Sequence, residues 1–197
     1  MNKTRLEAFS DGVIAIIITI MVLEMRAPEG ISWEIIQPLI PKFLSYFLSF
    51  LFLAIYWVNH HHLLHTVKKV TSYIMWANIN LLFWLSLIPF ATAWMGENHF
   101  EKYTVTCYAV LALLCGIAYS ILQAAIEKSY ANNSELKRII KHQKYKGIIS
   151  VIAYTLAIPL ALYVNPLLSG MIFFFVSVIW LIPDKNIERA FNIKNNF

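Results

Sequence analysis

The sequence predicts an all-α membrane protein whose chain crosses the bilayer six times. Hydrophobic residues make up 59% of its 197 residues and charged residues only 14%, whereas soluble domains average about 45–50% and about 25%. The apolar residues form continuous runs close to the roughly 20 residues that a helix needs to cross the hydrocarbon core. Because backbone groups in lipid must be satisfied within their own segment, these runs are expected to be helices.

The six spans are expected near residues 4–26, 39–64, 72–95, 103–127, 147–164 and 166–183. The connections between them are short and no internal repeat is visible, so we expect a single six-helix transmembrane domain over residues 1–197. Acidic residues interrupt the approach to the first apolar run, and no small-residue cleavage site follows it. The first span is therefore expected to be a retained helix rather than a signal peptide.

The Lys and Arg residues between the spans predict the orientation of the chain. With the N-terminus inside, the outer connections hold only Arg26, Lys42 and Lys102. The inner connections and the two termini hold the remaining Lys and Arg residues, which are Lys3, Arg5, Lys68, Lys69, Lys128, Lys137, Arg138, Lys141, Lys144, Lys146, Lys185, Arg189 and Lys194. Such an excess of inner positive charge predicts that both termini are cytoplasmic, in a cell (plasma) membrane. The net charge of +5 then requires no nucleic-acid partner.

Enzyme and metal chemistry are not indicated. There is no Gly-x-Ser-x-Gly segment and no phosphate-binding glycine loop. Cys107 and Cys115 would lie about 12 Å apart along one helix, too far for a disulfide. His61 and His65 have the i, i+4 spacing of metal ligands, but no third ligand is placed near them. We expect no metal, cofactor or small-molecule substrate, and the sequence leaves open whether the His60–His65 segment binds a metal or senses pH.

The first span is the unusual one. Its apolar run, residues 13–23, rises only about 16 Å, about half a bilayer, and ionisable residues flank it. Such residues at membrane depth usually face a protein interior or a wet cavity, so we expect this helix at the centre of an assembly. At 100° per residue, Ile16, Ile20 and Leu23 share one face, with Thr19 beside them. That pattern alone is typical of a core as well as of a pore lining.

Motifs in the first three spans resemble a known family. The segment Arg5-x-x-x-Phe9-Ser10-Asp11-Gly12, followed by Ala15-Ile16 and Thr19, resembles the signature of the transmembrane-protein-175 family of potassium channels. The pair Trp57-x-x-His60, and Asn78 followed eleven residues later by Pro89, also resemble this family. The resemblance runs by motif from Arg5 to about Pro89, and over the rest of the chain by the number and length of helices.

The resemblance implies a homotetramer in the lipid bilayer, with a central pore lined by the first helix of each subunit. It implies that Ile16 forms a hydrophobic constriction and that Ile20 and Leu23 are further apolar pore positions. Thr19 corresponds to a threonine near the constriction that contributes to selectivity. The transported species would be the potassium ion.

Physical chemistry fits these roles. A ring of four Ile16 side chains can close a pore by excluding water. A Thr19 hydroxyl can replace part of the hydration shell of an ion, and no Thr-Val-Gly-Tyr-Gly segment is present, so we expect modest potassium preference. Glu24 could form an outer ring of carboxylates that attracts cations, or it could simply be a solvated acid at a helix end.

Polar residues of the first three spans are expected to form an interhelical network. We expect a buried cluster of Asp11, His60 and Asn78 that clamps the inner half of the first helix, with Ser10 within reach. Arg5 should also find a partner on another helix, because an unpaired charge in a membrane is costly. Asn59 is a further candidate partner.

The sequence thus predicts a potassium-preferring channel with passive conduction through a homotetrameric pore. Two alternatives remain at this stage. One is a proton-permeable or weakly selective cation pore of the same build. The other is a non-conducting membrane scaffold protein with a dry bundle. A carrier is disfavoured, since carriers typically show repeated halves with broken helices.

Overall fold

The computed structural model describes residues 2–129 and 134–181, with the side chains of the second range described from residue 143 onward. This part of the chain contains eight helices and no strand, which confirms the predicted all-helical class. The helices are α1 (Lys3–Leu23), α2 (Trp33–Ile36), α3 (Leu39–His65), α4 (Ser72–Ser86), α5 (Ile88–Glu97), α6 (Lys102–Ser129), α7 (Ser134–Tyr163) and α8 (Pro166–Leu181).

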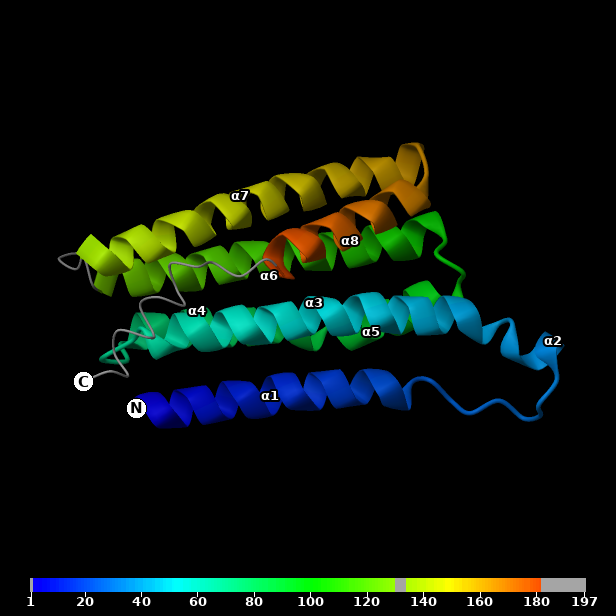
Figure 1. The fold of residues 1–197 in the computed structure, drawn as a ribbon, viewed down its shortest axis with the longest axis horizontal. Coiled ribbons are helices and arrows are strands. Elements are labelled where there is room, and N and C mark those ends of the chain that lie inside the picture. The colour runs from blue at the N-terminus through cyan, green and yellow to red at the C-terminus, as the bar shows by residue number, and fades with distance from the viewer. Residues whose placement is uncertain (1, 130–133, 182–197) are drawn as a thin grey trace.

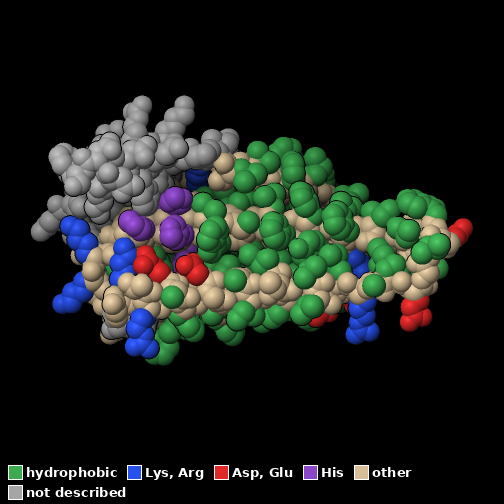
Figure 2. Space-filling model, turned by 60° about the horizontal axis from the view of Figure 1, so that its bottom comes forward, with side chains coloured by type: hydrophobic (Ala, Val, Ile, Leu, Met, Phe, Trp, Pro, Cys, Tyr) green, Lys and Arg blue, Asp and Glu red, His purple; other side chains and the backbone are tan. Residues whose placement is uncertain are grey.

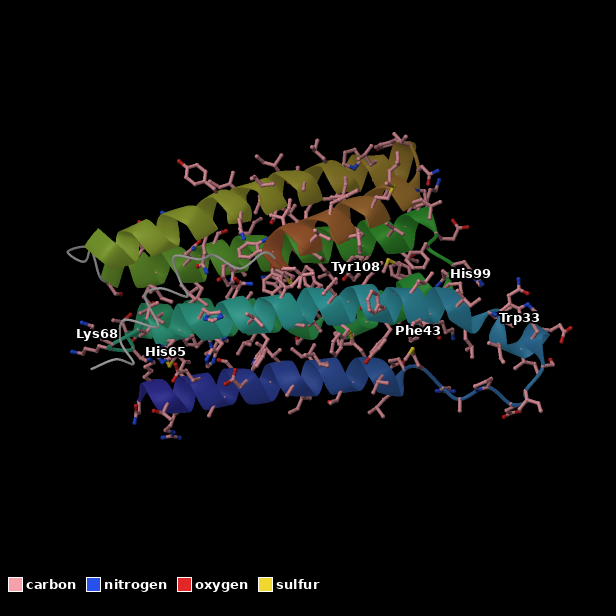
Figure 3. All side chains as sticks on the ribbon, viewed as in Figure 1. Trp33, Phe43, His65, Lys68, His99 and Tyr108 are labelled. Atoms are coloured by element: carbon pink, nitrogen blue, oxygen red, sulfur yellow. The ribbon has the colours of Figure 1, made fainter. Side chains whose placement is uncertain are left out.

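The long helices run side by side along one axis (Figure 1). α1 lies at one edge of the bundle and packs against α3, α4 and α5, whereas α6 packs against α4, α5, α7 and α8. The start of α1 and the α3–α4 connection lie at one end of the bundle. The α1–α3 connection, which includes α2, projects from the opposite end (Figure 1). Trp33 marks that projection in Figure 3.

Within the described residues, five helical segments are long and apolar enough to cross a membrane: Lys3–Leu23, Leu39–His65, Ser72–Glu97, Lys102–Ser129 and Gln143–Tyr163. They match the first five predicted spans. The sixth, α8, has 16 described residues and would rise about 24 Å. Residues 182–183 of the predicted sixth span lie outside the described residues. Lys185, Arg189 and Lys194 of the predicted inner set lie outside them as well.

Two boundaries within the first three spans differ from the sequence prediction, and α7 begins at Ser134 rather than near residue 147. α1 ends at Leu23, three residues early. Pro28 lacks the N–H that a continuing helix requires, and it disfavours helical backbone at Ala27. The predicted third span is two helices, α4 and α5, which meet at Leu87. Pro89 lies in the first turn of α5, where its missing N–H and its ring interrupt the helical hydrogen bonding.

The core of the bundle is formed by small residues on α6 and by an aromatic cluster. Ala109, Ala112 and Cys115 are fully buried, and such small side chains allow neighbouring helices to approach closely. Tyr108 on α6 points toward α3 and α8 (Figure 3). Its ring centroid lies 6.2 Å from that of Phe52 and 5.1 Å from that of Phe173.

Candidate functional site

α1 has two faces of different character. The face toward α3, α4 and α5 is buried and consists of Leu6, Ser10, Ile14, Ile17 and Met21. The opposite face is left uncovered by the rest of the subunit. Its large apolar side chains are Phe9, Ile16, Ile20 and Leu23, with 56%, 59%, 41% and 75% of their surface exposed. The predicted pore-lining residues therefore lie on the uncovered face.

The other residues predicted on this helix follow the same division. Arg5, Gly12 and Thr19 are exposed, and a Cβ added at Gly12 would meet nothing within 4 Å. The Thr19 hydroxyl donates a hydrogen bond of 2.9 Å to the carbonyl of Ile16. This bond leaves the Thr19 oxygen lone pairs available to a cation. Among the described residues Arg5 forms no ion pair, so its expected interhelical partner is not found in that part of the chain.

An open groove runs beside the uncovered face of α1. It measures about 500 Å³ and lies between α1 and the α4–α5 break, with Ile16, Ile20, Ser86 and Phe90 among its lining residues. Glu24, the residue that ends α1, lines it as well. Figure 2 brings the α1 side of the molecule forward, and there hydrophobic side chains cover the middle while charged ones gather toward the two ends.

A buried chain of hydrogen bonds joins α1, α4 and α3. The Asn78 Nδ2 donates to Ser10 Oγ at 2.9 Å, and Asn78 Oδ1 lies 2.6 Å from His60 Nε2. Ser10 in turn donates to the carbonyl of Leu6 at 2.8 Å. Ser10, Asn78 and His60 are each no more than 1% exposed. Because Asn78 presents its oxygen to the imidazole, the proton of the neutral His60 ring must be on Nε2.

Asp11 is not a member of this chain, which corrects the prediction of a single cluster. Its carboxylate accepts a hydrogen bond of 3.0 Å from the indole nitrogen of Trp57 on α3. The reason is geometric: neighbouring helical residues point about 100° apart, so Ser10 and Asp11 face different helices. Asn59 does not reach α1 either, because its amide donates to the carbonyl of Ile55 within its own helix at 2.8 Å.

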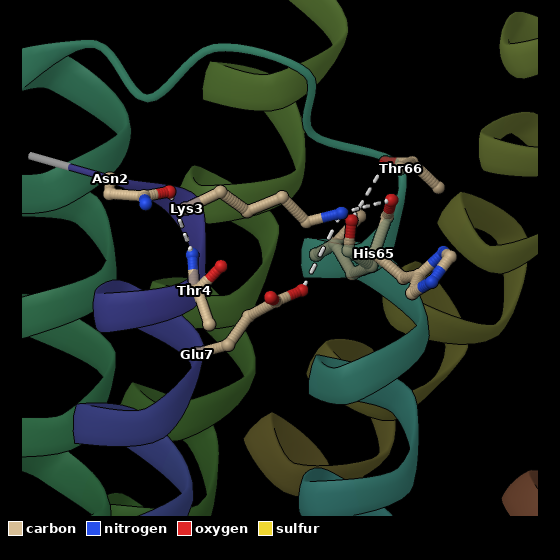
Figure 4. A network of polar contacts seen from close by, with 7 residues as sticks. Asn2, Lys3, Thr4, Glu7, His65 and Thr66 are labelled. Atoms are coloured by element: carbon tan, nitrogen blue, oxygen red, sulfur yellow. Dashed lines mark hydrogen bonds and ion pairs between the residues drawn. The ribbon is translucent and has the colours of Figure 1, made fainter.

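Two further contacts that the sequence reasoning missed hold the ends of α1. At the N-terminal end of α1, Lys3 Nζ donates to the carbonyl of His65 at 2.8 Å and lies 3.6 Å from the Glu7 carboxylate (Figure 4). An ammonium at a helix C-terminus is favourable, because the last carbonyls of the helix carry partial negative charge. Only the i, i+4 spacing of Lys3 and Glu7 was a visible signal in the sequence.

Toward the C-terminal end of α1, a network of hydroxyl groups on α3, α5 and α6 packs against Met21. Thr92 Oγ1 lies 2.7 Å from Ser49 Oγ and 3.9 Å from Met21 Sδ. Ser49 Oγ lies 3.1 Å from the Tyr108 hydroxyl. Polar residues within otherwise apolar spans, such as Ser49 and Thr92, were the available signal for interhelical hydrogen bonds.

The histidines at the C-terminal end of α3 are adjacent, but with the other described residues they do not form a metal site. The ring centroids of His61 and His65 are 6.3 Å apart, and those of Trp57 and His61 are 6.2 Å apart. Among the described residues, no group of three or more His, Cys, Asp or Glu side chains could hold a metal ion.

Comparison with known proteins identifies the family. The family model described as endosomal/lysosomal potassium channel TMEM175 matches residues 5–89. A protein named as a potassium channel, from Chryseobacterium sp. strain P1-3, is 52% identical over 190 residues, which cover 96% of this chain and 98% of that protein. The chain belongs to the TMEM175 family.

Solved TMEM175 structures share the fold. The crystal structure of a lysosomal potassium-selective channel TMEM175 homolog from Chamaesiphon minutus superimposes with a TM-score of 0.75 at 26% identity, covering 91% of this chain and 96% of that one. The endosomal/lysosomal proton channel TMEM175 of Gallus gallus is 31% identical over 125 residues, which are 54% of this chain but 25% of that protein. The present chain is thus a TMEM175-type ion channel and not an enzyme. It is a multi-pass membrane protein.

Proposed function

We propose that four copies of this chain, each forming one channel domain over residues 1–197, surround a central pore lined by α1. The observation that supports this most is the uncovered face of α1, which is apolar yet flanked by Arg5, Thr19 and Glu24. Charged and polar residues at membrane depth are costly against lipid. A position on the axis of an oligomer, facing water and other copies, removes that cost.

In this arrangement Ile16 forms the narrowest ring, with Ile20 and Leu23 one and two turns farther out. A ring of branched apolar side chains excludes water and closes the pore when α1 is close to the axis. Thr19 coordinates the permeating cation, and Glu24 raises the local cation concentration at the outer mouth. Potassium is the transported ion and moves passively, without a cofactor.

The proposed topology has α8 as the sixth span and both termini in the cytoplasm of the plasma membrane. This orientation is supported by the basic residues at one end of the bundle, where Lys3 lies beside the α3–α4 turn with Lys68 and Lys69 (Figure 1). A second candidate is a proton-permeable pore of the same build. The names of the vertebrate relatives favour it, since they describe proton channels.

The test is ion flux into liposomes that contain the purified protein, with potassium, sodium and protons compared in parallel. The Ile16→Asn variant replaces the apolar ring by a polar one, and Ile152→Asn, at a similarly exposed position on α7, is its control. We expect wild type to pass potassium faster than sodium, and only Ile16→Asn to leak more. Flux no greater than in empty liposomes from a folded oligomer would overturn the channel proposal, and proton flux above potassium flux would favour the second candidate.

A further inference from the structure

A narrow cleft lies between α3, α6, α7 and α8, away from the α1 face. About 30 Å³ of it can be occupied by the centre of a water molecule. Its lining on α3 extends from Phe52 to Asn59, which is about 10 Å along the helix axis. Spread evenly over that length, this space is about 1 Å in radius for the water centre, and the water radius of about 1.4 Å widens the slot to about 2.4 Å. A methylene chain needs roughly 2 Å, because carbon atoms touch at about 4 Å.

The lining changes character along this slot. The end near the middle of the bundle is formed by Phe52, Tyr154 and Val176. The inner end is formed by Asn59, Ser150 and Trp180, where the Trp180 indole donates to Ser150 Oγ at 2.8 Å. A lipid chain requires this same order, apolar toward the membrane centre and polar toward the headgroups.

A cation lies at the polar end. The Lys146 ammonium is 5.9 Å from the centroid of the Trp180 ring, and the next residue, Gly147, lines the slot. A basic residue beside an interfacial tryptophan, between membrane-spanning helices, is complementary to an anionic phospholipid headgroup. A neutral headgroup would gain nothing from this charge.

We propose that this cleft binds one anionic phospholipid, with its phosphate at Lys146 and Trp180 and an acyl chain along Phe52 and Tyr154. The choice of the inner leaflet rests on the proposed topology, but the binding does not rest on conduction. Binding there would also bear on α1, because the Tyr119 hydroxyl at the slot donates to the carbonyl of Asn59 at 3.2 Å. Asn59 directly precedes His60, which holds α1 through Asn78.

The experiment is native mass spectrometry of the full chain after reconstitution in vesicles with equal phosphatidylglycerol and phosphatidylcholine, followed by mild re-extraction. We expect wild type to retain phosphatidylglycerol preferentially, and Lys146→Gln to reduce that retention about fivefold, as expected for loss of one lysine near a lipid surface. Lys144→Gln removes the same charge two residues away, from a lysine that is paired with Glu127, and should retain the lipid.

A second pair of variants tests the acyl slot. A Cβ at Gly116 would lie 3.4 Å from Val151 Cγ2 and 3.9 Å from the Tyr56 hydroxyl, so the valine side chain of Gly116→Val takes up space where Gly116 lines the slot. A Cβ at Gly170 meets nothing within 4 Å. Gly116→Val should lose the lipid and Gly170→Val should keep it. The proposal would be overturned if wild type retained the two lipids equally or retained neither. It would also be overturned if Lys146→Gln and Lys144→Gln retained phosphatidylglycerol equally. Because no readout depends on ion flux, a failure here is distinct from a failure of the channel proposal.

Discussion

Trp57 on α3 donates its indole N–H to the Asp11 carboxylate on α1 at 3.0 Å, and this bond joins the two helices one residue away from the buried contact of Ser10. Trp57 and His60 lie one turn apart on α3. They hold Asp11 and Ser10, one directly and one through Asn78. The N-terminal half of α1 is thereby fixed in rotation as well as in position.

The bond between Asp11 and Trp57 should be needed for assembly or gating more than for ion preference. Asp11→Ala removes the acceptor, whereas Asp11→Asn keeps an oxygen that can accept from the indole. We expect Asp11→Ala to destabilise the protein by about 1.5 kcal/mol, the low end for a hydrogen bond to a charged group, because the site is half-buried. The measurement is the oligomer fraction on size-exclusion chromatography together with potassium and sodium flux. An intact oligomer with unchanged flux for Asp11→Ala would contradict the role assigned to this bond.

Removal of the Asn78 side chain should cost more stability than removal of the half-buried Asn59 side chain on α3. Asn78→Ala leaves His60 Nε2 buried without a partner and leaves Ser10 Oγ with only its bond to the carbonyl of Leu6, and an unsatisfied buried group costs about 1–3 kcal/mol. Asn59→Ala loses only a bond to its own helix. We expect a lower Tm for Asn78→Ala in detergent and little change for Asn59→Ala. Equal Tm values for the two variants would mean that the chain from His60 to Ser10 does not stabilise the fold.

Much of this arrangement could be predicted from the sequence. The helices could be predicted, but the helix that each polar side chain contacts could not. Run length and hydropathy gave five of the spans closely, since a membrane helix must be both long and apolar. The helical wheel placed Ile16, Ile20 and Leu23 on one face, which the subunit leaves uncovered. It could not tell which helix each polar residue of α1 would meet. The sequence therefore predicts Asp11 beside Asn78, which in the structure is the partner of Ser10.

Contacts to the backbone were out of reach for a related reason. The partner of Lys3 is the carbonyl of His65, and no side-chain pattern marks a carbonyl. Pro89 was visible, but a proline within a helical run can either kink one helix or separate two. Here it separates α4 from α5.

Neutralisation of Glu24 should lower potassium flux at low salt only. If Glu24 lies at the outer mouth, Glu24→Gln removes up to four charges that concentrate cations there. Screening acts over about 30 Å at 0.01 M salt but about 3 Å at 1 M, so the deficit should vanish at high salt. Glu34→Gln on α2 is the control, and the hydrogen bond with Ser32 lowers the pKa of the Glu34 carboxyl, so wild-type Glu34 is charged in the same buffers. A loss of flux that is equal at both salt concentrations, or equal in both variants, would argue against an electrostatic role for Glu24.

Gly96 should accept a side chain only at a cost in stability, because α5 meets α3 there. A Cβ at Gly96 would lie 2.4 Å from Ser45 Oγ and 2.9 Å from Lys42 Cα, and the second of these atoms belongs to the backbone. The two helices must separate to admit a methyl group, which typically costs about 1–3 kcal/mol. Gly170→Ala in α8 meets no atom within 4 Å and should gain up to about 1 kcal/mol from helix propensity. Thermal unfolding in detergent should therefore show a lower Tm for Gly96→Ala and an equal or higher one for Gly170→Ala. A Gly96→Ala protein as stable as wild type would show that α3 and α5 are not in close contact at this crossing.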